Sequence, residues 1–397
     1  MIEKDYQYYL NALRNEKLPA LVLDLDFFEE NLNDVLKKAN GKKIRMASKS
    51  IRSVELIKRV LKKDSQFEGI LCFSIEEAIF LAGKGLNNLL VAYPGLQSDV
   101  IDQVVEITKK GTLIVLMVDH FDQIKKISDR AKALNGQVNI CFDIDMSWHL
   151  PFLNFGVYRS PLRSLADVKN LYKKIKNLGN LNVVGIMGYE AQIAGLGDNL
   201  KNNFLKSQII RILKKISIPK IKELREEVVD FFQKEGISLP IRNGGGTGSL
   251  NTTSLETAVN EVTMGSALYS PTLFDNYQDF KFKPSLFFAL EVTRNPEGSI
   301  YTCNGGGYIA SGAPGWEKVP SPYLPSGMEL IKNEGAGEVQ TPLKMPKGFS
   351  IELGKPVFFR HAKAGEVCER FNEIIILSKG LIIERVKTYR GEGVCYF

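Results

Sequence analysis

Short, nearly continuous apolar runs alternate with amphipathic stretches from residue 42 to residue 266. A representative run, "TLIVLMVD", is followed by "HFDQIKKISDRAKALNG", in which apolar residues recur at the spacing of a helix. Strands of this kind that alternate with helices form parallel sheets covered on both faces, so the pattern predicts successive βαβ units. The apolar runs lie at 42–48, 69–74, 88–93, 112–119, 137–145, 181–190, 239–245 and 260–266.

Eight such strands are the number that closes a (β/α)8 barrel. We therefore predict an α/β fold with a TIM-like barrel, and a doubly wound open sheet is the alternative that periodicity alone leaves open. The connection at 197–236 is longer than the others and could hold two helices.

A different pattern begins near residue 276. From there the chain alternates apolar and polar residues between Gly-rich and Pro-containing turns, without a convincing helix, which predicts a mainly antiparallel β domain. The chain opens with an amphipathic helix and the apolar strand 19–26, which we assign to the same domain. The expected domains are thus a barrel over 27–275 and a β domain formed by 1–26 with 276–397.

Composition mainly excludes classes of protein. The 397 residues carry a formal charge of +7, but Lys and Arg lie in helix-like runs that predict solvated helix faces rather than a nucleic-acid site. No stretch approaches the apolar length of a membrane span, so we expect a cytoplasmic protein. The cysteines are odd in number and form no CxxC pair, which favours free thiols in a reducing compartment. They are Cys72, Cys141, Cys303, Cys368 and Cys395.

Candidate chemistry should gather where the barrel strands end, because barrels of this kind carry their sites at that face. Lys49 directly follows the first run, "KKIRMAS", and a buried ammonium without a partner is costly, so it has either a role or a surface position. Other polar residues at the expected ends are Tyr93, Asp119, Asp145, Tyr189, Glu190, Asn243 and Ser266.

A glycine-rich turn follows the seventh run. In "RNGGGTGSL" (242–250), Gly244, Gly245 and Gly246 precede Thr247 and Gly248, leaving backbone N–H groups unshielded by side chains. Such a turn can wrap an oxyanion, and barrels commonly hold a phosphate at this position. Gly265 and Ser266 after the last strand are placed to close the other side. The spacing is not that of a nucleotide-triphosphate loop.

A lysine opposite a phosphate cradle indicates a phosphorylated carbonyl compound held covalently. Pyridoxal 5′-phosphate (PLP) has both an aldehyde and a phosphate, and a Schiff-base aldolase acting on a sugar phosphate would use the same two features. These two readings stay open at this point.

Two stretches near the N-terminus, "LPALVLDLDFFEENL" and "RMASKSIRS", resemble the opening of fold-type III PLP enzymes, in particular the D-threonine aldolase and D-serine dehydratase branch related to alanine racemase. "GIMGYE", "GGGTGS", "VTMGSALY" and "GKPVFFRHAKAGEVCERFNE" fall where that branch carries its later motifs. The resemblance covers most of the chain. It implies PLP as cofactor, an amino acid of D configuration as substrate, and a homodimer whose barrel mouths are completed by the other subunit.

The resemblance also assigns residues. Lys49 matches the lysine that forms the Schiff base with PLP, and Arg159 matches an arginine facing the pyridine nitrogen. Tyr189 is a candidate for stacking or proton transfer. The cofactor-binding candidates are Lys49, Arg159, Gln192, Asn243, Gly244, Gly245, Gly246, Thr247, Gly248, Gly265, Ser266 and Tyr269.

The departure from the branch lies at its metal site. Relatives place a Cys or Asp two residues after a His, whereas here His361 is followed at that spacing by Lys363, whose ammonium repels a cation. We therefore do not expect a bound metal, and His361 and Cys368 are only weak candidate ligands. Our hypothesis is that Lys363 replaces the charge of the ion and polarises the substrate, so Lys363 and His361 join the catalytic candidates.

The predicted function is β-elimination or retro-aldol cleavage of a β-hydroxy amino acid. Amino acid racemisation is the nearest alternative, with a second acid/base from the partner's β domain, for which Tyr301, Tyr308 and Tyr323 are possible suppliers. A non-catalytic PLP carrier is a further alternative. Among the remaining candidates, His120 is predicted to neighbour a helix cap, His149 to line an insertion, and Cys303 to be a packed thiol.

Overall fold

The computed structural model describes residues 4–150, 152–201 and 203–396. Within it the chain forms two compact units. The first, which we call the barrel unit, comprises 35–49, 57–265 and 396. The second, which we call the β unit, comprises the chain up to residue 34 together with 50–56 and 266–395.

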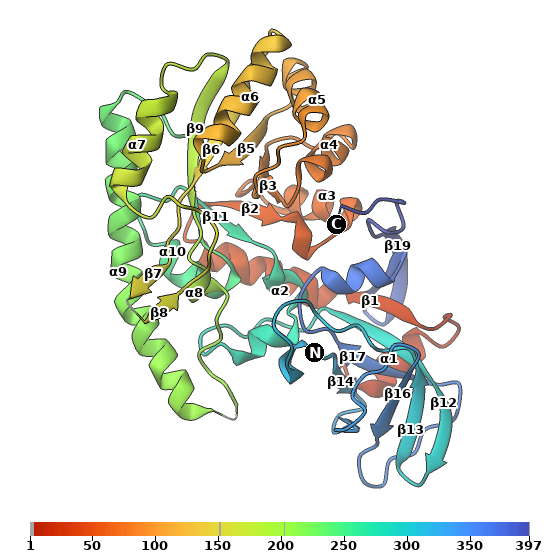
Figure 1. The fold of residues 1–397 in the computed structure, drawn as a ribbon. Helices are drawn as coiled ribbons and strands as arrows, with labels where there is room; N and C mark the ends of the chain where they lie inside the picture. Colours follow the sequence, from red (N-terminus) through yellow and green to blue (C-terminus); the bar gives the residue numbers. More distant parts are fainter. Residues whose placement is uncertain (1–3, 151, 202, 397) are drawn as a thin grey trace. The chain divides into compact units, whose positions relative to one another are not determined.

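The barrel unit is built on a closed parallel barrel, which confirms the predicted fold class (Figure 1). Its strands follow the order β10-β11-β2-β3-β4-β5-β6-β9, and each pairs with its neighbours in parallel. The eight strands coincide with the eight apolar runs. They are β2 (Lys43–Ala47), β3 (Phe67–Cys72), β4 (Leu89–Val91), β5 (Ile114–Val118), β6 (Val138–Asp143), β9 (Leu181–Gly188), β10 (Ile241–Gly244) and β11 (Glu261–Met264).

Amphipathic helices connect these strands. The N-termini of several are capped by side chains: Ser74 accepts a hydrogen bond from the Glu77 amide, and His120, predicted only to neighbour a cap, is itself the cap residue. The longer helices and their bounds are α2 (Leu25–Lys38), α3 (Val54–Lys63), α4 (Ile75–Gly83), α5 (Ser98–Lys109), α6 (Phe121–Ala133), α7 (Leu165–Ile175) and α9 (Phe204–Lys234), and the shorter ones are α8 (Ala191–Ala194) and α10 (Leu250–Thr253).

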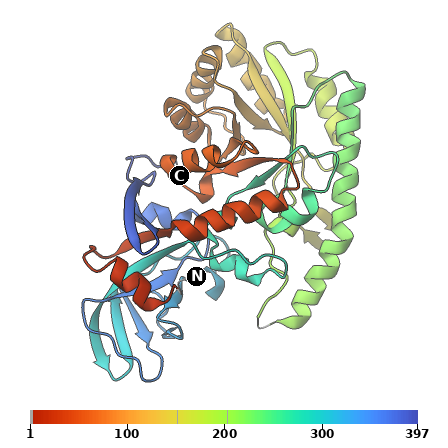
Figure 2. The ribbon, with the colours of Figure 1, turned by 180° about the vertical axis from the view of Figure 1, so that it is seen from behind.

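The described part of the connection at 197–236 holds one helix and not the two that the sequence suggested it could hold. After the single turn of α8, one 31-residue helix, α9, fills most of it and continues through Pro219 (Figure 2). A proline inside a helix removes one backbone hydrogen bond, but packing can override this. Here Ile210, Ile221, Val228 and Phe232 keep one buried line across the proline. A hairpin of β7 (Trp148–Leu150) and β8 (Leu153–Phe155) follows β6.

The β unit contains a nine-stranded sheet, which confirms the predicted, mainly antiparallel β segment. Its main path is β15-β16-β13-β12-β1-β18-β19, β17 pairs with β12 and β14, and only β1 and β18 run parallel. The strands are β1 (Ala20–Asp24), β12 (Leu286–Glu297), β13 (Ile300–Asn304), β14 (Ser321–Leu324), β15 (Glu329–Leu330), β16 (Gln340–Lys344), β17 (Pro356–Arg360), β18 (Glu373–Ser378) and β19 (Leu381–Lys387). The helices α1 (Tyr6–Ala12) and α11 (Ser266–Tyr269) also belong to this unit.

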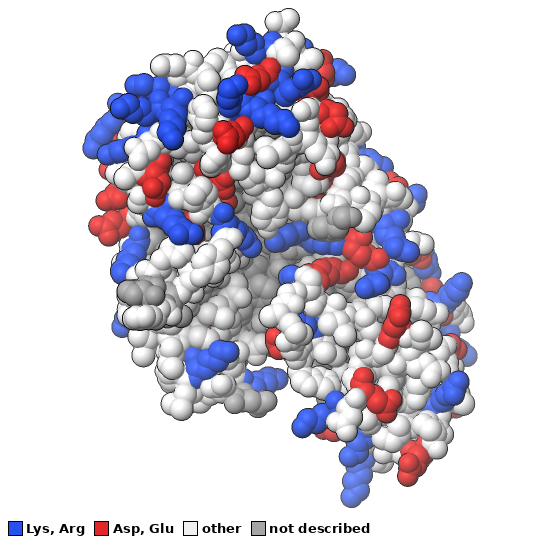
Figure 3. Space-filling model, in the orientation of Figure 1, with Lys and Arg blue, Asp and Glu red and all other residues white. Residues whose placement is uncertain are grey.

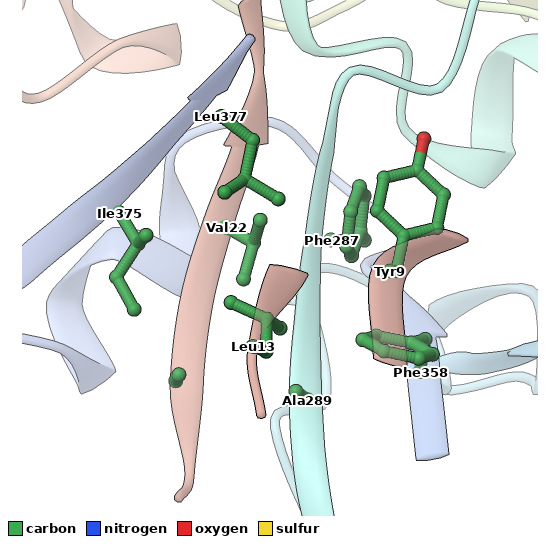
Figure 4. Packing of buried hydrophobic residues seen from close by; sticks show 9 residues of the cluster. Tyr9, Leu13, Val22, Phe287, Ala289, Phe358, Ile375 and Leu377 are labelled. Atoms are coloured by element: carbon green, nitrogen blue, oxygen red, sulfur yellow. The ribbon is translucent and has the colours of Figure 1, made fainter. Parts of the chain in front are cut away.

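One apolar core joins the N-terminal segment to this sheet. Tyr9 of α1 is fully buried, and its ring lies 4.8 Å from that of Phe287 and close to Phe358 (Figure 4). The Tyr9 hydroxyl donates to the Asp24 carboxylate over 2.8 Å, which satisfies the buried phenol. The remaining labelled members are Leu13, Val22, Ala289, Ile375 and Leu377. This packing explains why the first strand of the chain belongs to a sheet made otherwise of C-terminal strands.

The charged surface and the cysteine side chains agree with what the composition predicted. On the face drawn in Figure 3, Lys and Arg side chains are interspersed with Asp and Glu. Cys72 and Cys141 are buried free thiols inside barrel strands, as the sequence predicted, and Cys303 is a buried free thiol in the β unit. None of the helices in the described ranges combines the length and apolar character that crossing a bilayer requires.

Candidate active site

Lys49 lies just beyond the carboxyl end of β2. The strand ends at Ala47, one residue before the end of the predicted run, and Ser48–Ser50 form a single tight turn. The Ser48 hydroxyl donates to the Leu71 carbonyl over 3.0 Å, which ties the turn to the neighbouring strand. The Lys49 side chain is exposed, and its Nζ donates to the Tyr93 hydroxyl over 3.2 Å. The amine is therefore held at the barrel mouth by a phenol that follows β4.

Arg159 lies between two tyrosines at the same end of the barrel. Its guanidinium carbon is 5.7 Å from the ring centre of Tyr93 and 5.6 Å from that of Tyr189, distances at which a cation is attracted to an aromatic face. Tyr93, Arg159 and Tyr189 come from distant parts of the sequence, so the barrel alone brings them together. We call these three residues with Lys49 the mouth cluster.

The two tyrosines of the mouth cluster have opposite electrostatic environments. Burial alone would raise the pKa of Tyr93, but the charges of Lys49 and Arg159 and the hydrogen bond from Lys49 outweigh it, so its pKa is lowered. Burial raises the pKa of Tyr189 to about 12, even though Arg159 acts in the other direction. Tyr93 is therefore the phenol that gives up its proton more readily.

Asp143, the last residue of β6, was missed by the sequence analysis. Burial raises the pKa of its carboxyl to about 7, and the neighbouring carboxylates of Asp119 and Asp145 act in the same direction against Arg159. The only available signal was its place in "FDID", one pleat before the predicted Asp145. The predicted Asp145 already has partners within the barrel unit. Its Oδ2 lies 3.3 Å from His149 Nε2 and 3.4 Å from Arg163 Nε.

Two backbone amides of the glycine run bind other groups of the chain. The Gly245 amide donates to the Glu190 carboxylate over 3.2 Å, and the Gly246 amide donates to the Ser249 hydroxyl over 3.0 Å. These two amides are thus used within the chain. A phosphate contact would fall to the following turn, which begins at Thr247.

Glycine is needed in this run because neighbouring groups approach closely. A Cβ on Gly246 would lie 2.9 Å from the Ala194 Cβ and 3.1 Å from the Tyr189 ring. Gly245 adopts a φ of +85°, which side chains disfavour. The run therefore seats the loop against Tyr189 of the mouth cluster, which fits a cradle whose walls are the loop backbone and that ring.

A buried network of charged side chains holds this loop in place. Arg225 of α9 donates to Glu256 over 2.6 Å and to Glu190, and Ser249 donates to Glu190 over 2.5 Å. Burial opposes the charge on Glu190, but Arg225 and two hydroxyl donors, Ser249 and Thr253, keep its pKa below the usual range. We call Glu190, Arg225 and Glu256 the loop network.

Two predicted cofactor contacts have internal partners in the barrel unit. Asn243 donates to Glu261 and to Thr263, each over 2.8 Å, and Glu261 also binds Arg45. Gln192 donates to the Ser217 hydroxyl over 3.1 Å and to a backbone carbonyl. Their contact with a cofactor stays a prediction, since both side chains already connect elements of the barrel.

The sequence of this chain matches a known protein family over most of the barrel. Residues 23–272 match the family described as alanine racemase, N-terminal domain. The chain belongs to this family. The predicted resemblance to the D-threonine aldolase and D-serine dehydratase branch, related to alanine racemase, is thereby confirmed.

Individual relatives of the alanine racemase N-terminal domain family are distant. A 3-hydroxy-D-aspartate aldolase of Paracoccus denitrificans (strain Pd 1222) is 25% identical over 267 residues, which is 67% of this chain and 63% of that protein. The chain thus spans less than two thirds of that relative's length. Among solved structures, D-threonine aldolase from Filomicrobium marinum superposes with a TM-score of 0.80 at 18% identity, covering 96% of both chains. D-threo-3-hydroxyaspartate dehydratase from Delftia sp. HT23 gives 0.72 at 17% identity, covering 95% and 98%. These structural likenesses show the fold.

The site candidates outside the barrel lie in the β unit. Ser266 is 3.4 Å from the Ser50 hydroxyl, and the buried Tyr269 donates to the Ile51 carbonyl over 2.9 Å. Burial lowers the pKa of His361 to about 3, with the charge of Arg360 acting in the same direction, and its ring meets that of Tyr269 edge-on. His361 is therefore neutral at physiological pH.

The residues at the metal position that the resemblance predicts do not fit a cation here. Lys363 Nζ lies 2.7 Å from the Glu366 carboxylate and donates to Ser311 over 2.9 Å, so an ammonium occupies this position. The Cys368 thiol approaches the Ile51 carbonyl at 3.6 Å, and burial raises its pKa to about 12, which disfavours the thiolate that binds metals. In the residues that the structure describes, no group of three or more potential ligands comes together.

Proposed function

We propose that this chain is a PLP-dependent lyase that acts on a β-hydroxy D-amino acid. The observation that carries the proposal is the mouth cluster, in which the Lys49 amine lies 3.2 Å from the Tyr93 hydroxyl at the carboxyl face of a family-typical barrel. A primary amine is the group that PLP requires for covalent attachment. The inferred location is the cytoplasm.

The residues present fit PLP. Lys49 would hold the aldehyde carbon, and the turn beginning at Thr247 would hold the phosphate across from it. Arg159, stacked between two tyrosines, provides a cation at the mouth. When bound, PLP supplies an electron sink that stabilises negative charge at the substrate's Cα.

The chain's own residues then manage protons. The Tyr93 hydroxyl orients Lys49 Nζ, and the charges of Lys49 and Arg159 lower the pKa of this phenol against the effect of its burial. This arrangement supports Lys49 as the base that handles the proton on the substrate. Tyr189, whose pKa is raised to about 12, keeps its proton and can act as a hydrogen-bond donor or packing surface beside the loop.

The substrate class rests on what similar proteins are named for. The 3-hydroxy-D-aspartate aldolase, the D-threonine aldolase and the D-threo-3-hydroxyaspartate dehydratase all carry in their names an amino acid of D configuration with a β-hydroxyl. Cleavage of Cα–Cβ gives glycine and an aldehyde, whereas loss of the β-hydroxyl as water gives an enamine, which tautomerises to an imine and is hydrolysed by water to a keto acid and ammonia. Amino acid racemisation is the second candidate, because an alanine racemase of Clostridium difficile shares the fold with a TM-score of 0.66.

A spectrum and a product analysis test the proposal. Protein loaded with PLP should absorb in the visible range, and borohydride should fix the cofactor on the peptide that contains Lys49. Incubation with D-threonine, D-threo-3-hydroxyaspartate and D-alanine then distinguishes aldehyde, keto acid and racemate as products. Attachment to a different lysine, or a colourless protein, would contradict the proposal. Lys49→Ala should lose the absorbance and at least about a thousandfold in turnover, and Lys110→Ala serves as the control.

A further inference from the structure

A cavity of about 440 Å³ that opens to solvent lies beyond the carboxyl ends of β3 and β4, within the barrel unit. Its walls are the loops that follow these two strands and the first turns of α4 and α5. Apolar and aromatic residues form most of the lining: Phe73, Ile75, Tyr93, Pro94, Leu96 and Val100. A concave, mainly apolar pocket of this size is typical of a site for a small molecule.

The cavity and the mouth cluster share one wall. Tyr93 lines the cavity, and its hydroxyl accepts a hydrogen bond from Lys49 Nζ over 3.2 Å. The proposed chemistry brings the Cα of the substrate next to this amine, so the β-substituent of the substrate has to lie within a side chain's length of it. The cavity is therefore placed to receive that β-substituent.

The lining of the cavity offers no cation to a substrate. Of the described residues that line it, Glu76 alone has a charged side chain, and this charge is negative. Lys49 and Arg159 lie close to Tyr93, but neither belongs to the lining. A carboxylate on the β-carbon of the substrate would thus lose water without gaining a partner of opposite charge.

The helix ends beside the cavity do not supply the missing positive charge. Both α4 and α5 begin there, and a helix N-terminus attracts anions. In α4, however, the Ser74 hydroxyl already accepts from the Glu77 amide. The first turn of α4 carries Glu76 and Glu77, and that of α5 carries Asp99. The chain's own carboxylates therefore compensate both helix ends and repel a further one.

Two lining residues differ in how firmly they are packed. Ile75 is buried, and a Cβ on Gly95 would lie 2.7 Å from its Cδ1. Leu96 is 47% exposed, so it lies where the lining meets solvent. The wall at Ile75 tolerates little change, whereas Leu96 can be replaced without disturbing a packed core.

We infer that this cavity selects substrates whose β-substituent is uncharged and apolar, such as an aryl group, and rejects those that carry a carboxylate there. Glu76 and Leu96 determine this preference, because Glu76 repels a second carboxylate and Leu96 gives it no hydrogen bond. The inference rests on the proposed function and narrows it. D-threo-phenylserine is then a better substrate than the hydroxyaspartate that appears in the names of two of the similar proteins.

The ratio of kcat/KM for D-threo-phenylserine to that for D-threo-3-hydroxyaspartate tests the inference in the PLP-loaded chain. The unmodified protein should favour phenylserine by at least about 100-fold. Glu76→Lys with Leu96→Arg places two cations at the cavity and should lower this ratio by at least about 100-fold, mainly through KM. The matched control, Glu106→Lys with Leu113→Arg, changes two exposed residues of the barrel unit that lie outside the lining and should keep the ratio.

Two small probes test the cavity in the PLP-free chain. Benzyl alcohol and benzoate share a ring and differ in the carboxylate. Saturation-transfer NMR should therefore detect benzyl alcohol on the unmodified protein, and benzoate on the variant with Glu76→Lys and Leu96→Arg. Circular dichroism of each variant checks that the fold is retained, and the selectivity of the unmodified protein tests the inference without any variant.

The outcomes separate the inference from the proposed function. A chain that loads PLP and cleaves its substrate but favours D-threo-3-hydroxyaspartate would overturn the inference and leave the proposed function in place. An unchanged kcat/KM ratio in the cavity variant would do the same. Benzoate that binds the unmodified protein as well as benzyl alcohol does would overturn the inference whatever the PLP spectrum shows. Failure to load PLP would contradict the proposed function whatever the probes show.

Discussion

The mouth cluster of the barrel unit and the segment from His361 to Cys368 of the β unit both contain side chains capable of chemistry, but their environments differ. At the mouth, Lys49 and Arg159 lower the pKa of Tyr93 and so make a proton easier to move. In the β-unit segment, burial lowers the pKa of His361 to about 3 and raises that of Cys368 to about 12, so neither changes its protonation state near neutral pH. The difference shows that cations facing a phenol create reactivity, whereas burial without a compensating charge suppresses it.

The comparison also separates two ways of using a positive charge. Arg159 is stacked between aromatic rings, with no salt bridge to an acid among the described residues. Lys363 is paired with Glu366, whose own pKa is held below its usual range despite burial by that lysine and by Ser311. The charge that Lys363 could offer a substrate is therefore reduced by its partner.

The largest expected effect concerns the support beneath the mouth. Arg225→Met leaves Glu190 and Glu256 buried without their shared cation, so we expect the free energy of unfolding to fall by about 3–5 kcal/mol. Arg130→Met is the control, because the Arg130–Asp102 pair is at the surface, where solvent screens it, and its loss should cost far less. Urea denaturation of both variants measures the difference. Equal losses would mean that the loop network is not specially stabilising.

Lys363→Met tests whether the β-unit segment replaces a metal. If the ammonium polarises the substrate, turnover should fall by about 100-fold while the absorbance of PLP-loaded protein is unchanged. Lys355→Met, which removes an exposed lysine near Glu352, should have no effect. Chelator treatment should also leave turnover unchanged, and mass spectrometry should find no stoichiometric metal. Unchanged turnover in Lys363→Met would remove the hypothesis.

Tyr93→Phe tests the mouth cluster itself. The variant keeps the ring that stacks on Arg159 but loses the hydroxyl that binds Lys49, so we expect about a tenfold loss in turnover. The pKa of Tyr93 lies below 10, and its titration should therefore give an alkaline limb in the rate of PLP loading that the variant lacks. Tyr158→Phe, at an exposed tyrosine nearby, is the control. The same pH profile in both variants would assign the limb to another group.

How far the sequence predicts these features depends on whether the signal is local. The barrel strands were predictable because their apolar runs and intervening helical periods are local patterns, and Lys49 followed from its place at a strand end. The contact of Arg159 with Tyr93 was not, since it joins residues 66 positions apart through the closed barrel. Arg225 looked like any other cation on a charged helix. The continuation of α9 through Pro219 depended on a buried line that packing, not propensity, supplies.

The last prediction concerns Asp143, the acid at the edge of the mouth. Its pKa is raised to about 7 in the folded protein from 3.8, so the folded state binds more protons than the unfolded state between these values. Stability should therefore fall as pH rises from about 4 to 7, and the penalty should be fully present above 7. Asp143→Asn removes this penalty, so it should raise the free energy of unfolding at pH 8, by about 4 kcal/mol if the whole shift is expressed, and change it little at pH 4. Urea denaturation at the two pH values measures both differences, and Asp129→Asn on the surface is the control. An equal effect at the two pH values would show that the effect of the substitution does not come from the protonation of the carboxyl. The contrast between the mouth cluster and the segment from His361 to Cys368 would then rest on Tyr93 alone.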